Sequence, residues 1–119
     1  MMTIEFARGD SYERGFLLKN RKTGQPITET YDNVYFTAKR MYTDKEYKFQ
    51  KRMSDEGIIN DGEGHYTLYI YPEDTDGLPF GEYDFDIEFV KGRYKKTFSG
   101  KLTLAKETTH ADNEIQADG

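Results

Sequence analysis

The 119-residue chain has no cysteine, no tryptophan and only three prolines. Without cysteine it has no disulfide bonds, no thiolate nucleophile and no thiolate metal site. Basic residues are also few, since 17 Lys and Arg stand against 22 Asp and Glu and give a net charge of -5. A protein that neutralises phosphates needs a basic surface, so this balance argues against a nucleic-acid partner.

Long apolar runs are missing as well. No segment approaches the roughly 20 apolar residues of a membrane span, and the N-terminal MMTIEFARGD lacks the apolar core of a signal peptide. We therefore expect a chain made in a cytoplasm, with no membrane partner. Hydrophobic residues make up 35% of the chain, but 15% of it is aromatic. Aromatic side chains bury large areas, so a single thin-cored domain is expected rather than disorder.

The clearest local signal is an alternation over residues 81–92, GEYDFDIEFVKG. Apolar residues at every second position predict a half-buried β-strand. Its apolar side holds Tyr83, Phe85, Ile87 and Phe89, and its ionic side holds Glu82, Asp84, Asp86 and Glu88. We interpret the carboxylates as a solvated sheet face rather than a binding site.

The following segment, RYKKTFSGKLTLAK, fits this strand as a hairpin partner. A two-residue loop at Lys91-Gly92 would place apolar residues opposite one another and lysines opposite carboxylates. The predicted pairs are Phe89 with Tyr94, Phe85 with Phe98, Glu88 with Lys95, and Glu82 with Lys101.

Further short strands are predicted in TIEF, SYERGFLLKN, DNVYFTAKRMY, EYKFQKRM and HYTLYIYPED, joined by turn-rich segments. Seven strands without a convincing helix predict an all-β, immunoglobulin-like antiparallel β-sandwich over residues 1–105. Residues 106–119 are predicted to form a polar tail. Leu78, Gly81 and Tyr83 stand where a loop enters a strand, as in the tyrosine corner of such sandwiches. A plain inward core tyrosine is the alternative.

The tripeptide Arg8-Gly9-Asp10 matches an integrin-binding signal. It also suits a tight turn between the first two strands, because glycine tolerates positive φ and Asp is a common turn residue. We interpret Gly9 and Asp10 as structural turn residues.

No motif marks a catalytic or metal site. The only side chains with an ordinary pKa near neutrality are His65 and His110, and Ser11, Ser54 and Ser99 lack any nucleophile motif. The acidic loops PEDTDG and NDGEG lack the spacing of a calcium-binding loop. We expect no enzyme activity, no metal and no cofactor.

Several tyrosines are predicted to point away from the core and to form a candidate interface. They are Tyr69, Tyr71 and Tyr35, with Tyr31 and Tyr42 as further members. Such a face suits a protein interface or a sugar-stacking platform. The absence of tryptophan favours protein contact; a carbohydrate-binding module and an ordinary outer sheet face remain the alternatives.

Four segments follow one another in the order IEFARGDS, VYFTAKR, YTLYIYPEDTDGLPFGEYDFDIEF and KKTFSGKLTLAKE. Together they resemble the N-terminal domain of phage baseplate upper proteins and related small structural proteins of phages and prophages of Gram-positive bacteria. The resemblance spans roughly residues 3–107, and PEDTDGLPFGEYDFDIE is its most specific part. The matching residues are Gly9, Asp10, Pro72, Glu73, Asp74, Thr75, Leu78, Gly81, Tyr83, Asp86, Thr97, Gly100, Leu102 and Leu104.

The resemblance implies a β-sandwich that docks onto a tail or baseplate core and presents receptor-binding proteins. Its partners would be other tail or baseplate proteins, with a homo-oligomer as an open alternative. It implies no catalytic residues. It also implies a protein that is made in the bacterial cytoplasm and carried in the virion.

Overall fold

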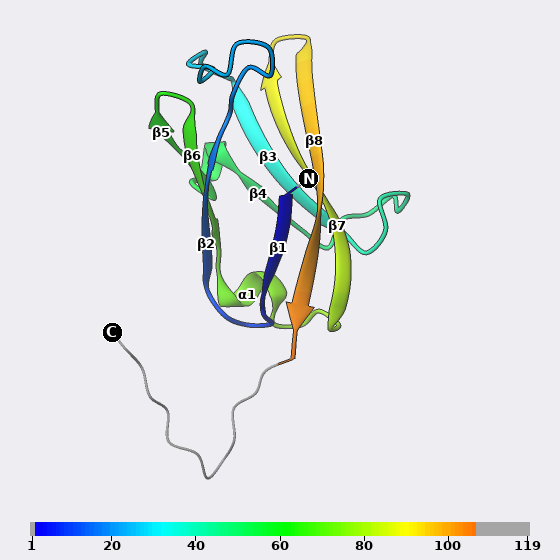
Figure 1. Cartoon of the computed structure of the whole chain (residues 1–119). Helices are drawn as coiled ribbons and strands as arrows, with labels where there is room; N and C mark the ends of the chain where they lie inside the picture. Colours follow the sequence, from blue (N-terminus) through cyan, green and yellow to red (C-terminus); the bar gives the residue numbers. More distant parts are fainter. Residues whose placement is uncertain (1, 107–119) are drawn as a thin grey trace, which may run out of the picture.

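The computed structural model describes residues 2–106, which form two stacked β-sheets (Figure 1). A five-stranded sheet, in the order β1-β8-β7-β3-β4, lies against a three-stranded sheet, in the order β2-β6-β5. The strands are β1 (Met2–Ala7), β2 (Tyr12–Leu17), β3 (Asn33–Lys39), β4 (Phe49–Arg52), β5 (Ile58–Gly62), β6 (His65–Ile70), β7 (Gly81–Lys91) and β8 (Tyr94–Ala105). The predicted all-β sandwich is confirmed, with eight strands rather than seven. The predicted tail beyond Lys106, including His110, lies outside the described residues.

Two short helical segments and one strand were not predicted. The chain forms a 3-10 turn, η1 (Met53–Asp55), and a one-turn helix, α1 (Pro72–Thr75). The segment read as the turn NDGEG instead supplies the end of β5, which has a bulge between Asn60 and Gly62. A strand this short, with an irregular end, carries no two-residue alternation to reveal it.

The first strand departs from the antiparallel expectation. β1 runs parallel to β8, from Met2 opposite Gly100 to Ala7 opposite Ala105. Strands that pair in parallel need a long crossover. Here nearly the whole chain separates the two strands, so no local pattern could reveal their pairing.

The hairpin of β7 and β8 has the predicted faces but a different register. The loop is Gly92-Arg93 rather than Lys91-Gly92, so Phe85 lies opposite Gly100 and Phe98 lies opposite Ile87. Gly92 has a φ of 58° at the first loop position, and its amide donates to Asp32 Oδ2 at 2.6 Å. The observed β7–β8 register therefore goes together with a hydrogen bond between the hairpin loop and Asp32, which lies sixty positions earlier in the chain. The shift of two residues keeps every side chain on its predicted face.

Phe89 lies at the centre of the core between the sheets. Its ring makes edge-to-face contacts with Phe16, Tyr31, Tyr66 and Phe98 at centroid distances of 5.2 to 6.3 Å. This geometry is favourable for aromatic pairs. The other buried apolar side chains come from both sheets: Ile4, Leu18, Val34, Phe36, Ala38, Phe49, Ile58, Leu68, Ile70, Tyr83, Phe85, Ile87, Leu102 and Leu104.

The predicted tyrosine corner is present. Tyr83 is 1% exposed, and its hydroxyl donates to the carbonyl oxygen of Pro79 at 2.6 Å. The guanidinium of Arg40 lies over the Tyr83 ring, 4.8 Å from its centroid. Gly81 enters β7 with a φ of 118°, a conformation that side chains rarely adopt. Gly81 and Tyr83 therefore have the structural roles expected of them.

Gly100 leaves room for the β1–β8 pairing. A Cβ atom at this position would lie 2.4 Å from the carbonyl oxygen of Met2 and 2.4 Å from the ring of Phe85. One neighbour is backbone and the other is a buried ring, so neither can move cheaply.

We expect Gly100→Ala to lower the free energy of unfolding by about 2 kcal/mol, because overpacking a core typically costs about 1–3 kcal/mol. Urea denaturation followed by circular dichroism measures the change. Gly77→Ala is the matched control, since no atom lies within 4 Å of a Cβ built there. Equal midpoints for the two variants would show that the close approach at Gly100 is not tight.

Candidate binding surfaces

The Arg8-Gly9-Asp10 tripeptide forms the turn that carries the chain from β1 in one sheet to β2 in the other. Gly9 has a φ of 82°, and the Asp10 amide donates to the Ala7 carbonyl oxygen at 3.1 Å. The Gly9 amide donates to the hydroxyl of buried Thr75 at 2.9 Å. The Arg8 guanidinium is engaged by the protein itself: it lies 4.0 Å from the centroid of the Phe80 ring, and Nη1 donates to the Leu78 carbonyl oxygen at 3.1 Å. An adhesion signal needs an accessible arginine, so the turn interpretation holds.

The acidic loop after β6, PEDTDG, forms hydrogen bonds that hold its own conformation and join it to β4. Asp74 Oδ2 accepts from the Tyr71 amide at 2.8 Å, which caps α1, and also from Lys51 Nζ at 2.8 Å. The Leu78 amide donates to the Thr75 carbonyl oxygen at 2.9 Å and closes the loop. Among residues 2–106, no group of three acidic, histidine or cysteine side chains is placed to hold a metal ion.

The histidine and serine residues considered as catalytic candidates differ in their surroundings. His65 is exposed at the start of β6. Ser99 Oγ donates to Asp86 Oδ1 at 2.7 Å, and Ser54 Oγ accepts from Asn33 Nδ2 at 3.1 Å.

No helix within residues 2–106 is long and apolar enough to cross a membrane.

The ionic face of the β7–β8 hairpin centres on Asp84. This carboxylate accepts a hydrogen bond from Lys101 Nζ and another, at 2.8 Å, from the Tyr42 amide. These bonds, that from Lys101 first, lower the pKa of Asp84, and the pKa of Lys101 is raised in turn. The predicted Glu88–Lys95 and Glu82–Lys101 pairs lie diagonally in the sheet, each at 3.9 Å. The face is a structural ion-pair network, as the sequence indicated.

The predicted tyrosine face is divided by the fold, which corrects the grouping of Tyr35 with Tyr69 and Tyr71. Tyr35 lies on β3 of the five-stranded sheet, whereas Tyr69 lies on β6 of the other sheet. Tyr31 is 5% exposed and belongs to the core. Tyr42 lies in the loop after β3. Sequence alternation places residues on faces of a strand but does not say which strands share a sheet.

Tyr69 and Tyr71 do share one shallow hollow. Its other lining residues are Gln50, Lys51, Asp55, Glu56, Gly57 and Ile59. The ammonium of Lys51 lies over the Tyr71 ring, 4.9 Å from its centroid. Desolvation raises the pKa of Tyr69, as do the nearby Glu13 and Asp61. The hollow offers two phenols that can donate hydrogen bonds, beside carboxylates and an amide that can accept them.

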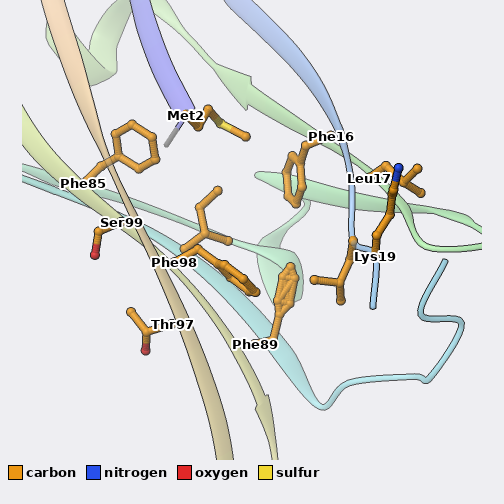
Figure 2. A pocket seen from close by; sticks show the side chains of 11 residues that line it. Met2, Phe16, Leu17, Lys19, Phe85, Phe89, Thr97, Phe98 and Ser99 are labelled. Atoms are coloured by element: carbon orange, nitrogen blue, oxygen red, sulfur yellow. The ribbon is translucent and has the colours of Figure 1, made fainter. Parts of the chain in front are cut away.

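A second concave surface, the apolar groove, was not found from the sequence. It opens between the end of β2 and the first half of β8, and Figure 2 shows Phe16 and Phe98 within it. Phe98 is 42% exposed and Leu17 is 38% exposed. Phe98, which the sequence placed opposite Phe85 on the apolar side of the hairpin, is therefore not covered. The residues that line the groove are Met2, Phe16, Leu17, Leu18, Lys19, Phe85, Ile87, Phe89, Thr97, Phe98 and Ser99.

Phe98 is exposed because β8 extends beyond the strands that cover its inner side. Phe98 points to the inner side with its partner Ile87, but Ile87 is 4% exposed and Phe98 is not buried. The one signal in the sequence is Lys96, which interrupts the apolar side of β8 at the same end. A lysine on an inner face indicates that water reaches that face.

No family model matches the sequence, and no curated protein matches it. Among solved structures, the chain is similar to the endo-beta-1,4-mannanase from Thermotoga petrophila, with a TM-score of 0.53 and 14% identity. The match covers 88% of this chain and 18% of the mannanase chain. At this identity the likeness shows the β-sandwich fold alone.

The Asp84 network predicts how stability depends on pH. A carboxyl whose pKa is lowered by folding stabilises the native state above its unfolded pKa, near 4, and loses this contribution as pH falls through the folded value. We expect Asp84→Asn to lower the free energy of unfolding by about 1 kcal/mol at pH 7. The deficit should shrink below pH 4 in urea denaturation. Glu82→Gln is the control and should change little; a deficit for Asp84→Asn that is independent of pH would contradict the assignment.

Proposed function

We propose that this chain is a non-catalytic structural β-sandwich that works through protein–protein contacts, as a component of a phage or prophage tail or baseplate. The observation that carries the contact role is the apolar groove, where Phe98 and Leu17 are exposed side by side with buried core residues. Exposed apolar surfaces with a polar rim often mark sites of protein contact. Covering the groove would also add stability to a domain with a lean core.

The tail or baseplate assignment rests on the resemblance of PEDTDGLPFGEYDFDIE to that family. In the structure this block builds one corner of the sandwich, where Asp74 caps α1, Thr75 accepts from the first turn, and Tyr83 closes the loop. These are scaffolding roles. The block thus shapes the sandwich, and the groove supplies the contact surface.

A carbohydrate-binding module is the second candidate, and the Tyr69–Tyr71 hollow favours it. Tyrosine rings can stack on sugars, and the adjoining Gln50, Asp55 and Glu56 offer hydrogen-bond partners. A mannanase is named for acting on a polysaccharide, and the likeness extends over 18% of that chain. We rank this candidate second because Lys51 already occupies the face of Tyr71.

The contact role predicts association. In sedimentation velocity, we expect the chain to form a faster-moving species, either with a product of a neighbouring gene or with itself. Leu17→Ser should weaken that species at least ten-fold, whereas Tyr71→Ala should leave it unchanged. A monomer in every mixture, from a locus without tail genes, would refute the proposal.

The two candidates make opposite predictions for glycans. If the contact role is right, an array that includes mannan oligosaccharides should give no signal with the full chain. Signals that are lost in Tyr71→Ala and kept in Leu17→Ser would replace the first proposal with the second. A loss of about ten-fold corresponds to the roughly 1.4 kcal/mol that one aromatic contact can supply.

A further inference from the structure

β8 is twice as long as the strand that covers its outer edge. β8 has 12 residues and β1 has 6, and β1 pairs only with the half from Gly100 to Ala105. Within the part of the chain that the structure describes, no strand pairs with that edge over residues 94–99. All six of these residues are exposed.

The direction of the backbone groups on this edge follows from the ladder. Ala105 presents its carbonyl oxygen to the β1 side, where it accepts from the Arg8 amide at 3.1 Å. Backbone groups of successive strand residues point to opposite edges, and the β7–β8 register has no bulge. Lys95 and Thr97 therefore present their N–H and C=O groups at the open edge, in line with β1.

The apolar groove lies beside this edge. Its volume is about 520 Å³, within the range of roughly 300–1,000 Å³ of pockets that hold ligands. Phe98 and Phe89 form its base, Phe16 and Leu17 stand on the β2 side, and Thr97 and Ser99 point away from it (Figure 2). A strand added beside residues 94–99 would alternate its side chains, one set toward the groove and the other toward water.

Two lysines give the groove a positive rim. Lys19 lines it, and Lys96 points to its side of β8 with the partner Phe89. Among residues 2–106, neither lysine forms an ion pair, whereas Lys95 and Lys101 on the other face pair with Glu88 and Asp84. The lysines on the groove side are thus available to a carboxylate of a ligand.

We propose that residues 94–99 of β8 accept an extended, acidic and apolar segment of a partner protein as an added strand, in line with β1. This inference rests on the proposed contact function and names the partner's chemistry. An apolar side chain of the segment would lie between Phe16 and Phe98. Acidic side chains two residues away, on the same face of the added strand, would meet Lys19 and Lys96. Strand addition takes its affinity from main-chain hydrogen bonds and its specificity from pockets for alternate side chains.

A second copy of the same edge is a poorer occupant. Pairing two β8 edges would bring Lys95 and Lys96 of both copies close together, and like charges across a ladder are destabilising. Lysines on an edge strand are a common device against such self-pairing. The charges therefore select a partner of opposite sign.

The test uses the full chain and a blocked heptapeptide, Thr-Glu-Thr-Val-Thr-Glu-Thr, followed by NMR. In an extended strand its valine and both glutamates share one face. We expect the peptide to slow amide exchange at Lys95 and Thr97 and to shift the resonances of Phe98. The matched peptide with lysine in place of both glutamates should bind at least ten-fold more weakly. Lys96→Glu leaves one positive and one negative charge on the rim, so it should abolish this preference. Phe98→Ser should weaken both peptides. Both positions are exposed, so the fold should tolerate the changes.

Saturating peptide that leaves the Lys95 and Thr97 amides unprotected would overturn the inference, as would shifts confined to the Tyr69–Tyr71 hollow. The same measurement on a partner complex found by sedimentation separates the two claims. A complex with these amides unprotected keeps the contact function and removes strand addition. The absence of both complex and peptide binding removes both.

Discussion

The structure depends on the alternation of side chains along β7. The last of its inward residues is Phe89. The Phe89 ring contacts aromatic residues from β2, β6, β8 and the segment before β3. A chain with 35% hydrophobic residues has few apolar side chains to bury, so a few large rings must join the two sheets. The outward carboxylates of the same strand pair with lysines of β8, and this outer face of the sheet is exposed to solvent.

Around this centre, the corner formed by the first turn, α1 and the start of β7 ties the sheets together. The Gly9 amide donates to the hydroxyl of Thr75, which lies far along the chain. Asp74 caps the start of α1 and also accepts from Lys51 of β4. Arg8, Asp74 and Thr75, from the segments Arg8-Gly9-Asp10 and PEDTDG, form hydrogen bonds within this corner. The candidate binding surfaces are the apolar groove and the tyrosine hollow.

The groove exists because the two sheets are unequal. Five strands lie against three, and β8 continues past β1 at one end. This leaves apolar side chains and backbone groups exposed at the same place, each of which would be stabilised by an added strand. The tyrosine hollow, by contrast, presents polar groups to water and needs no cover. We rank protein contact above sugar binding because the groove leaves apolar side chains and unpaired backbone groups exposed, whereas the hollow presents polar groups.

The sequence by itself determined the fold class, the faces of β7 and β8, the tyrosine corner and the turn at Gly9-Asp10, because each depends on neighbours within about ten residues. The tertiary structure decided what depends on distant segments: the parallel pairing of β1, the register set beside Asp32, and the separation of Tyr35 from Tyr69. It also decided that Phe98 is uncovered. Alternation tells which way a side chain points, but only the arrangement of the sheets determines what lies in front of it.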